Sequence, residues 1–100
     1  MKHLLQIDFP YHGPFGDDMT QQMAGLAHDI ANEDGLLWKL WTYNEKTEEA
    51  GGVYLFENAS DAHRYLLKHT ERLKSFGYDT INAKIFCVNE ALSAITKYPF

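Results

Sequence analysis

His69 is the side chain in this sequence that is best suited to proton transfer. It lies near the middle of an apolar stripe that recurs at helical spacing, and Arg72 follows three residues later. A histidine there could act as a general base near pH 7, and Arg72 could orient it or bind an anionic substrate. The structural alternatives are a neutral, hydrogen-bonded histidine in the core and an arginine that pairs with a surface carboxylate.

Three further polar residues could serve the same chemistry. Asp8, on a predicted strand, could be a base if burial raised its pKa, and Lys39, between two tryptophans, could stabilise a phenolate. Asp8 could equally be a solvated carboxylate at a strand end, and Lys39 could extend its ammonium group into solvent. His12, in a loop rich in glycine and proline, could cover a pocket or simply be exposed.

Aromatic residues on the predicted strands could form the walls of a substrate pocket. The four candidates are Trp41, Tyr54, Phe56 and Phe86. Large flat rings stack on aromatic ligands, but the same rings could instead form the core of a dimer.

The sequence shows none of the common cofactor patterns. Its five histidines and its single cysteine, Cys87, lack the spacing of a zinc site. No Gly-rich dinucleotide loop, P-loop or nucleophile elbow occurs. We therefore expect neither a metal nor an organic cofactor.

The bulk properties exclude several classes of partner. The net charge of -5 disfavours nucleic acid and anionic membrane surfaces, which require a basic face. No apolar stretch approaches the roughly 20 residues of a membrane span, and no signal peptide is evident. We expect a cytoplasmic protein whose 100 residues form a single domain, residues 1–100.

The elements that must position these residues follow the order β-α-β-β-α-β. Alternating apolar residues predict strands at 4–9, 36–43, 50–56 and 80–88. One helix is expected to begin at an N-cap at Asp17 or Asp18 and to end at Asp34-Gly35. A second is expected to begin at an N-cap at Ser60 and to end at Gly77 in the C′ position, and a short third one is expected in the tail. Right-handed crossovers then place both main helices on one face of a four-stranded antiparallel sheet, an α+β ferredoxin-like fold.

The two faces of this sheet can be assigned from residue type. The aliphatic pairs are expected to pack against the helices: Leu5/Ile7, Val53/Leu55 and Ile81/Ile85. The mixed pairs are expected on the uncovered face: Gln6/Asp8, Lys39/Trp41, Tyr54/Phe56 and Lys84/Phe86. An uncovered apolar face favours a homodimer with a ligand pocket between the subunits. A glutamate at Tyr54 would then force monomers.

Several segments resemble the YdhR family of proposed mono-oxygenases, in the dimeric α/β-barrel superfamily. They are GPFGDDM (13–19), GLLWKLWT (35–42), EAGGVYLF (49–56), YLLKHTERLKSFG (65–77) and AKIFCVNEALS (83–93). The resemblance implies a ferredoxin-like subunit that forms a homodimer. It also implies a cofactor-independent mono-oxygenase that acts with O2 on a small or polycyclic aromatic, phenol- or quinol-like compound.

Two other functions stay open at this point. The same pocket could bind an aromatic or other apolar ligand without turnover. It could also support another reaction of the superfamily, such as isomerisation or a haem-related activity, because fold alone does not determine chemistry. No catalytic motif of the family is transferred, so the candidate catalytic residues remain His69, Asp8 and Arg72.

Overall fold

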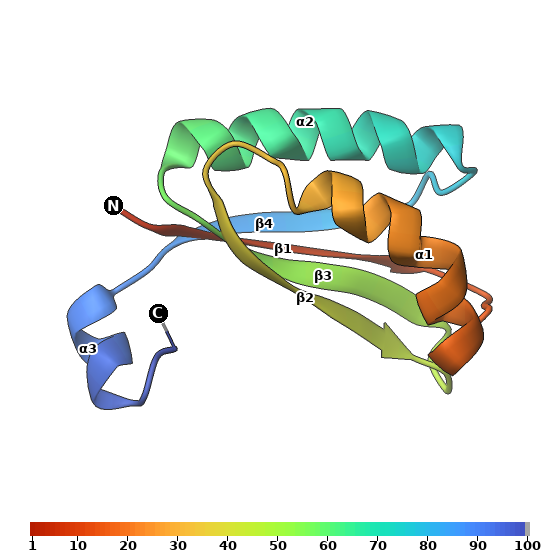
Figure 1. Ribbon diagram of the computed structural model, residues 1–100, viewed down its shortest axis with the longest axis horizontal. Helices are drawn as coiled ribbons and strands as arrows, with labels where there is room; N and C mark the ends of the chain where they lie inside the picture. Colours follow the sequence, from red (N-terminus) through yellow and green to blue (C-terminus); the bar gives the residue numbers. More distant parts are fainter. Residues whose placement is uncertain (100) are drawn as a thin grey trace.

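The computed structural model describes residues 1–99 and has the expected order of elements. They are β1 (His3–Pro10), α1 (Gly16–Ile30), β2 (Leu36–Asn44), β3 (Glu49–Phe56), α2 (Ala59–Ser75), β4 (Asn82–Cys87) and α3 (Glu90–Ile95). The sheet order is β2-β3-β1-β4, and every neighbouring pair is antiparallel. The α+β, ferredoxin-like fold predicted from the sequence is confirmed (Figure 1).

Local signals determine where the second helix begins and ends. The N-cap of α2 is Asn58, whose side chain accepts a hydrogen bond from the Asp61 N–H at 2.8 Å. The N-cap predicted at Ser60 is therefore wrong by two positions. Gly77 follows the helix with a φ of +99°, and the Tyr78 N–H donates to the Leu73 carbonyl at 3.0 Å. This Schellman ending confirms the role predicted for Gly77.

The first helix begins without a side-chain cap. Its N-cap is Phe15, so the N-cap predicted at Asp17 or Asp18 is wrong, and both aspartates lie within the first turn. Carboxylates in a first turn still stabilise the helix, because they face the positive end of its dipole.

The structure corrects the face assigned to β3. Tyr54 lies opposite Leu5 in the sheet, and Val53 lies opposite Gln6. Because paired residues share a face, Tyr54 and Phe56 face the helices, whereas Val53 and Leu55 do not. The prediction was wrong because alternation shows which residues share a face and not which face is covered.

The face assigned to β2 is also corrected. Lys39 lies opposite Tyr54 and Trp41 opposite Gly52, so both side chains are on the helix side of the sheet. A register shift between Leu36 and Trp38 lets Leu36 pack against the core, while Trp38 belongs to the other face. The assignments for β1 and β4 hold, with Asp8 and Phe86 on the face away from the helices.

The core lies between the sheet and the helices α1 and α2. Its buried members are Leu5, Ile7, Phe9, Tyr11, Met19, Ile30, Ala50, Tyr54, Phe56, Ala62, Tyr65 and Leu73. Six of the side chains that form this layer come from β1 and β3, the two central strands. The core therefore lies over the middle of the sheet, and β2 and β4 form its two edges.

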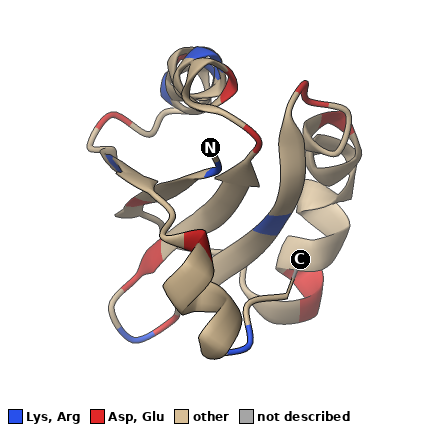
Figure 2. Cartoon of the chain, turned by 90° about the vertical axis from the view of Figure 1, so that its left-hand side faces the viewer, with Lys and Arg blue, Asp and Glu red and all other residues tan. Residues whose placement is uncertain are grey.

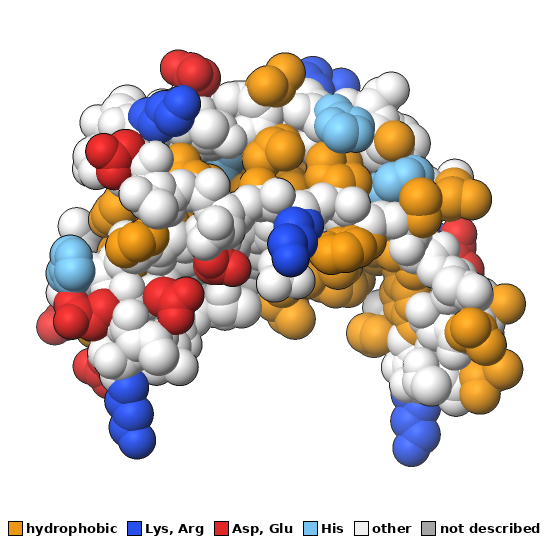
Figure 3. Space-filling model, turned by 180° about the vertical axis from the view of Figure 1, so that it is seen from behind, with side chains coloured by type: hydrophobic (Ala, Val, Ile, Leu, Met, Phe, Trp, Pro, Cys, Tyr) orange, Lys and Arg blue, Asp and Glu red, His pale blue; other side chains and the backbone are white. Residues whose placement is uncertain are grey.

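The side of the sheet away from the helices, here called the open face, is apolar as predicted, but most of its apolar residues differ from those predicted. Its apolar members are Leu4, Trp38, Leu40, Val53, Leu55 and Phe86. The segment from α3 to Pro99 covers one end of this face, around Leu55 and Trp38. Figure 3 shows this side of the molecule hollowed between two projections, with hydrophobic side chains at its roof.

Charged residues belong mostly to the helices and loops, and few belong to the sheet (Figure 2). Within residues 1–99, no helix is both long and apolar enough to cross a membrane.

Candidate functional site

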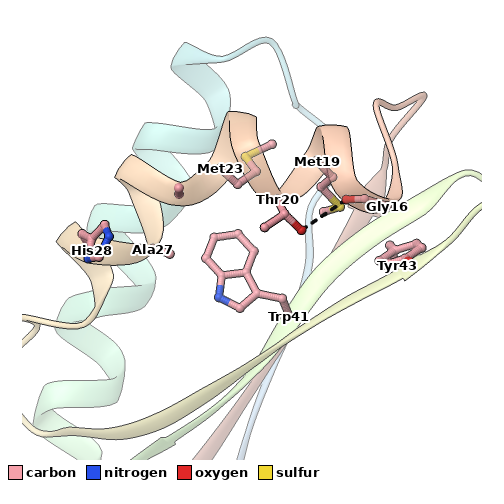
Figure 4. A pocket seen from close by; sticks show the side chains of 9 residues that line it. Gly16, Met19, Thr20, Met23, Ala27, His28, Trp41 and Tyr43 are labelled. Atoms are coloured by element: carbon pink, nitrogen blue, oxygen red, sulfur yellow. Dashed lines mark hydrogen bonds between the residues drawn. The ribbon is translucent and has the colours of Figure 1, made fainter.

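A cavity of about 400 Å³, here called the outer pocket, lies between α1 and the edge strand β2. Its lining residues are Gly16, Met19, Thr20, Met23, Ala24, Ala27, His28, Trp41 and Tyr43. The Trp41 indole rises from β2 toward α1 and lies below Thr20, Met23 and Ala27 (Figure 4). Small side chains on this side of α1 leave the space open. The volume is within the range of pockets that hold small organic ligands.

A second cavity, here called the inner chamber, lies deeper between the sheet and the helices. Its lining includes Lys39, Trp41, Tyr54, His69 and Met23 together with other apolar side chains. Its free volume is about 30 Å³, which is roughly the share of one water molecule in the liquid. Trp41, Met19 and Met23 line both cavities, so the two adjoin across these side chains.

The glycine pair in β3 makes room for this chamber. A Cβ at Gly52 would lie 2.6 Å from Cε of Lys39, so a larger residue there would displace the lysine from its path over the strand. A Cβ at Gly51 would lie 1.9 Å from the Ile7 carbonyl oxygen of the neighbouring strand. Pairing is continuous through both glycines, so their role is close approach and not a bulge.

His69 is held by a chain of polar contacts from α2 to α1. Arg72 donates to Nδ1 of His69 from Nε at 3.2 Å and from Nη2 at 3.0 Å. Its Nη1 donates to Asp29 Oδ2 at 2.7 Å. Because a guanidinium group has no acceptor, Nδ1 must accept, and the proton of the neutral ring is on Nε2. His69 is thus a donor through Nε2.

The surroundings of His69 disfavour its charged form. The ring is buried, stacks on Tyr65 with centroids 5.0 Å apart, and meets Tyr54 edge to face at 6.2 Å. Burial, together with the positive charges of Lys39 and Arg72, lowers the pKa of His69 to about 3. The imidazole is therefore neutral at pH 7 and is a weak base.

Lys39 is the second polar group of the chamber. Its Nζ lies 3.3 Å from the centroid of the Trp41 ring and 4.7 Å from that of Tyr54. Burial, with a smaller contribution from the Arg72 charge, lowers the pKa of Lys39 to about 7. The two ring faces favour the ammonium form by about 1 kcal/mol and so offset only part of the cost of burial.

Two buried tyrosines complete the polar cluster. The Tyr65 hydroxyl donates to the Tyr54 hydroxyl at 3.3 Å. Burial raises the pKa of Tyr65 to about 12 and that of Tyr54 further still. Both phenols therefore stay protonated, and neither can take a proton from a substrate near neutral pH.

One comparison with known proteins gave a match. The family model described as "Putative mono-oxygenase ydhR" matches residues 4–99, which include every residue of the two cavities. The chain belongs to this family. A comparison with curated proteins found no match.

In this YdhR-family chain, five of the residues singled out from the sequence come together. They are Lys39, Trp41, Tyr54, His69 and Arg72, and they gather at the inner chamber or against its histidine. They come from β2, β3 and α2, which meet on the helix side of the sheet.

Four other candidates lie elsewhere in the YdhR-family subunit. Asp8 and Phe86 are on the open face, where Asp8 accepts a hydrogen bond from Asn82 at 3.1 Å. His12 is exposed, pairs with Glu48 and lines neither cavity. Phe56 is fully buried in the core and stacks on Tyr54, with centroids 6.3 Å apart.

The sequence reasoning missed the α1 side of the site. The helical spacing of Met19, Met23 and Ala27 indicates packing residues, yet all three line the outer pocket. The signal was the run of small residues on the same helix, including Thr20 and Ala24, which cannot fill the space above a tryptophan. Within residues 1–99, no group of three or more His, Cys, Asp or Glu side chains is arranged to hold a metal ion.

Proposed function

We propose that this protein is a mono-oxygenase that binds a phenol- or quinol-like aromatic compound in the outer pocket and oxidises it with O2, without a metal or organic cofactor. The observation that carries the proposal is an apolar pocket of about 400 Å³ that adjoins a chamber with a buried, oriented His69. Membership of a family described as mono-oxygenases supports the same reaction class.

The reaction balances without an external reductant. The phenol loses its hydroxyl proton, and the phenolate transfers one electron to O2. The two radicals combine to form a C–O bond, and a proton added to the peroxide gives a hydroperoxide. The hydroperoxide then loses a ring C–H proton and its terminal OH as water, which leaves a quinone. Phenol and O2 are thus converted into quinone and water.

The site residues have distinct roles in this proposal. The Trp41 indole stacks against the substrate ring, and the apolar lining keeps bulk water away from the phenolate and the radical pair. The Nε2–H of His69 donates to the oxygen that becomes negatively charged. Arg72, anchored by Asp29, keeps His69 in the tautomer that can donate, so Arg72 is a positioning residue.

The first test measures oxygen uptake with a panel of phenols, quinols and fused-ring aromatics, after thermal-shift screening for binding. We expect uptake with at least one ligand that stabilises the protein, in samples free of metal and flavin. Replacing His69 by alanine should lower kcat about 100-fold, as the loss of an oxyanion donor does elsewhere. His63→Ala, at an exposed position of the same helix, is the matched control and should leave kcat unchanged.

A binding module for an apolar or aromatic ligand is the second candidate. It is favoured by the low pKa of His69, which makes this residue a poor base. Stabilisation by ligands with no oxygen uptake would support this alternative and would contradict the mono-oxygenase.

We also propose that the protein acts as a cytoplasmic homodimer with aromatic compounds and O2 as its small-molecule partners. The support is the open face, where Leu40 is 59% and Phe86 45% exposed next to other apolar side chains. A soluble subunit rarely leaves such a surface in water, and a second copy of the sheet would cover it.

A further inference from the structure

Among the described strands, a single charged side chain faces the helices. The charged residues of these strands are Asp8, Lys39, Glu49 and Lys84, one in each strand. Asp8, Glu49 and Lys84 share the register of the open face, whereas Lys39 lies opposite Tyr54 on the helix side. A charge at a position that otherwise suits an apolar residue calls for a functional explanation.

Lys39 also has no carboxylate to balance it. Lys2 pairs with Glu90 at 2.9 Å and Lys68 pairs with Glu33, but within residues 1–99 no carboxylate pairs with Lys39. Its nitrogen instead lies between two aromatic rings, those of Trp41 and Tyr54. The charge that acts on Lys39 is the guanidinium of Arg72, which has the same sign as a lysine ammonium and so disfavours it.

The other polar side chains around the chamber are poorer candidates for a base than a neutral amine. From α2 these are His69, whose Nδ1 is occupied by Arg72, and Arg72 itself. From β3 and the loops they are the hydroxyls of Tyr54, Tyr11 and Tyr78. From α1 the chamber receives only apolar side chains, since Asp29 pairs with Arg72 outside its lining. A base for the reaction is therefore still needed, and burial lowers the pKa of Lys39 to about 7.

We propose that Lys39 is the base of this site: its neutral amine takes the hydroxyl proton of the phenol and, as an ammonium ion, pairs with the phenolate that it has formed. This inference rests on the proposed function, because it assigns a catalytic residue to the same pocket. The proton moves from the phenolic oxygen to Nζ, and later from Nζ to the peroxide formed from O2. Lys39 ends the cycle neutral, and no other reactant is required.

The geometry lets Lys39 reach a substrate. The outer pocket and the inner chamber adjoin at Trp41, and Nζ lies over the ring of that same indole. The lysine side chain has four rotatable bonds, so its nitrogen can move past the edge of the indole to a hydroxyl bound there. In the neutral form no cation–π attraction holds the nitrogen on the ring.

A phenol whose ionised form has its own absorption band, such as 2-naphthol, tests the inference without turnover. Its apparent pKa is measured when it is bound, in the absence of O2, by titration of the absorbance. In the wild-type protein we expect bound naphthol to ionise at least tenfold more readily than free naphthol. Lys39→Met should abolish this gain, and Lys84→Met, the same change on the open face, should retain it.

The variant Lys39→Arg distinguishes a residue that acts as a base from one that only supplies a positive charge. Arginine pairs with a phenolate but does not release its proton in proteins. The variant should still favour ionised naphthol when it is bound, yet kcat/KM for oxygen uptake, which follows the ionisation of the free phenol, should rise only near pH 10. An unchanged pH profile in Lys39→Arg would overturn the role of base.

The outcomes distinguish this inference from the proposed function. Easier naphthol ionisation that depends on Lys39, without oxygen uptake with any substrate, would support Lys39 as a base and contradict the mono-oxygenase. Oxygen uptake that is unaffected in Lys39→Met would support the mono-oxygenase and overturn the inference. Failure of naphthol and the other phenols to bind the wild-type protein would overturn both.

A second measurement follows the amine itself. The rate of acetylation of Lys39 is followed by mass spectrometry as a function of pH, with Lys84 as an internal standard in the same molecule. We expect Lys39 to become reactive with a midpoint near pH 7, well below the ordinary lysine value of about 10.4. A midpoint for Lys39 near that ordinary lysine value would contradict the inference.

Discussion

His69 shows how neighbouring groups decide what a side chain can do. A histidine is usually considered as a base near pH 7, but burial, Lys39 and Arg72 lower the pKa of His69 to about 3. The two donors of Arg72 occupy its acceptor nitrogen. What remains is a fixed N–H, which suits the stabilisation of a negative oxygen better than the removal of a proton.

The same shift predicts a pH dependence of stability. In the unfolded chain the pKa of His69 returns to about 6.5, so between pH 6.5 and 3 the unfolded state binds a proton that the folded state does not. The free energy of unfolding should therefore fall as the pH drops through this window, by at most about 1.4 kcal/mol per pH unit from this group. Urea unfolding at a series of pH values measures the slope.

The matched variants are His69→Gln and His63→Gln. The first should flatten the slope between pH 6.5 and 3, because it removes the group that titrates only in the unfolded state. The second changes an exposed histidine of the same helix and should leave the slope as it is in the wild type. Equal slopes in all three proteins would show that His69 is not kept neutral by the fold.

At the scale of the elements, strand β3 packs closely against β1 at a glycine, Gly51, where a side chain would not fit. A Cβ at Gly51 would lie 1.9 Å from the Ile7 carbonyl oxygen, a backbone atom that can move only if β1 and β3 separate. Gly51→Ala should therefore lower the free energy of unfolding by about 3 kcal/mol, the upper range for overpacking. Urea unfolding monitored by circular dichroism measures the loss.

The control for this change is a glycine in a helix. Beyond the local backbone of α1, no atom lies within 4 Å of the position that a Cβ at Gly25 would occupy, so an alanine there meets open space. Because glycine is a poor helix former, Gly25→Ala should raise the free energy of unfolding by about 0.5–1 kcal/mol. A similar effect of both substitutions would mean that the close approach at Gly51 is relaxed in solution.

For the whole molecule, the corrected assignment of sheet faces changes which substitution can test the proposed dimer. Tyr54 is buried under the helices, so a glutamate there should unfold the subunit instead of separating two intact ones. Leu40, which is 59% exposed on the open face, is the informative position.

Leu40→Glu should raise the dissociation constant of the proposed dimer at least about tenfold, or about 1.4 kcal/mol. The reason is that a carboxylate would be buried between two apolar sheets. Leu67→Glu, at a 73% exposed position of α2, is the matched control and should leave association unchanged. Sedimentation velocity measures both, and equal dissociation constants for the two variants would contradict a dimer built through the open face.

The order of the elements could be predicted from the sequence alone, because it depends on short-range patterns. Alternation in β1, the helical spacing of α2 and the positive φ required of Gly77 act over a few residues and are visible without tertiary contacts.

The site was decided by the tertiary structure. The alternation of residues along each strand predicted that Lys39 shares a face with Trp41, and Tyr54 with Phe56. Only the pairing of β3 with its neighbours, Tyr54 opposite Leu5 and Lys39 opposite Tyr54, shows that all four are on the helix side. That pairing brings Lys39 near His69 and Arg72, which belong to a helix much further along the chain, and so determines which protonation states are favoured. A strand's own sequence shows which side chains share a face, but what covers that face depends on packing between distant segments.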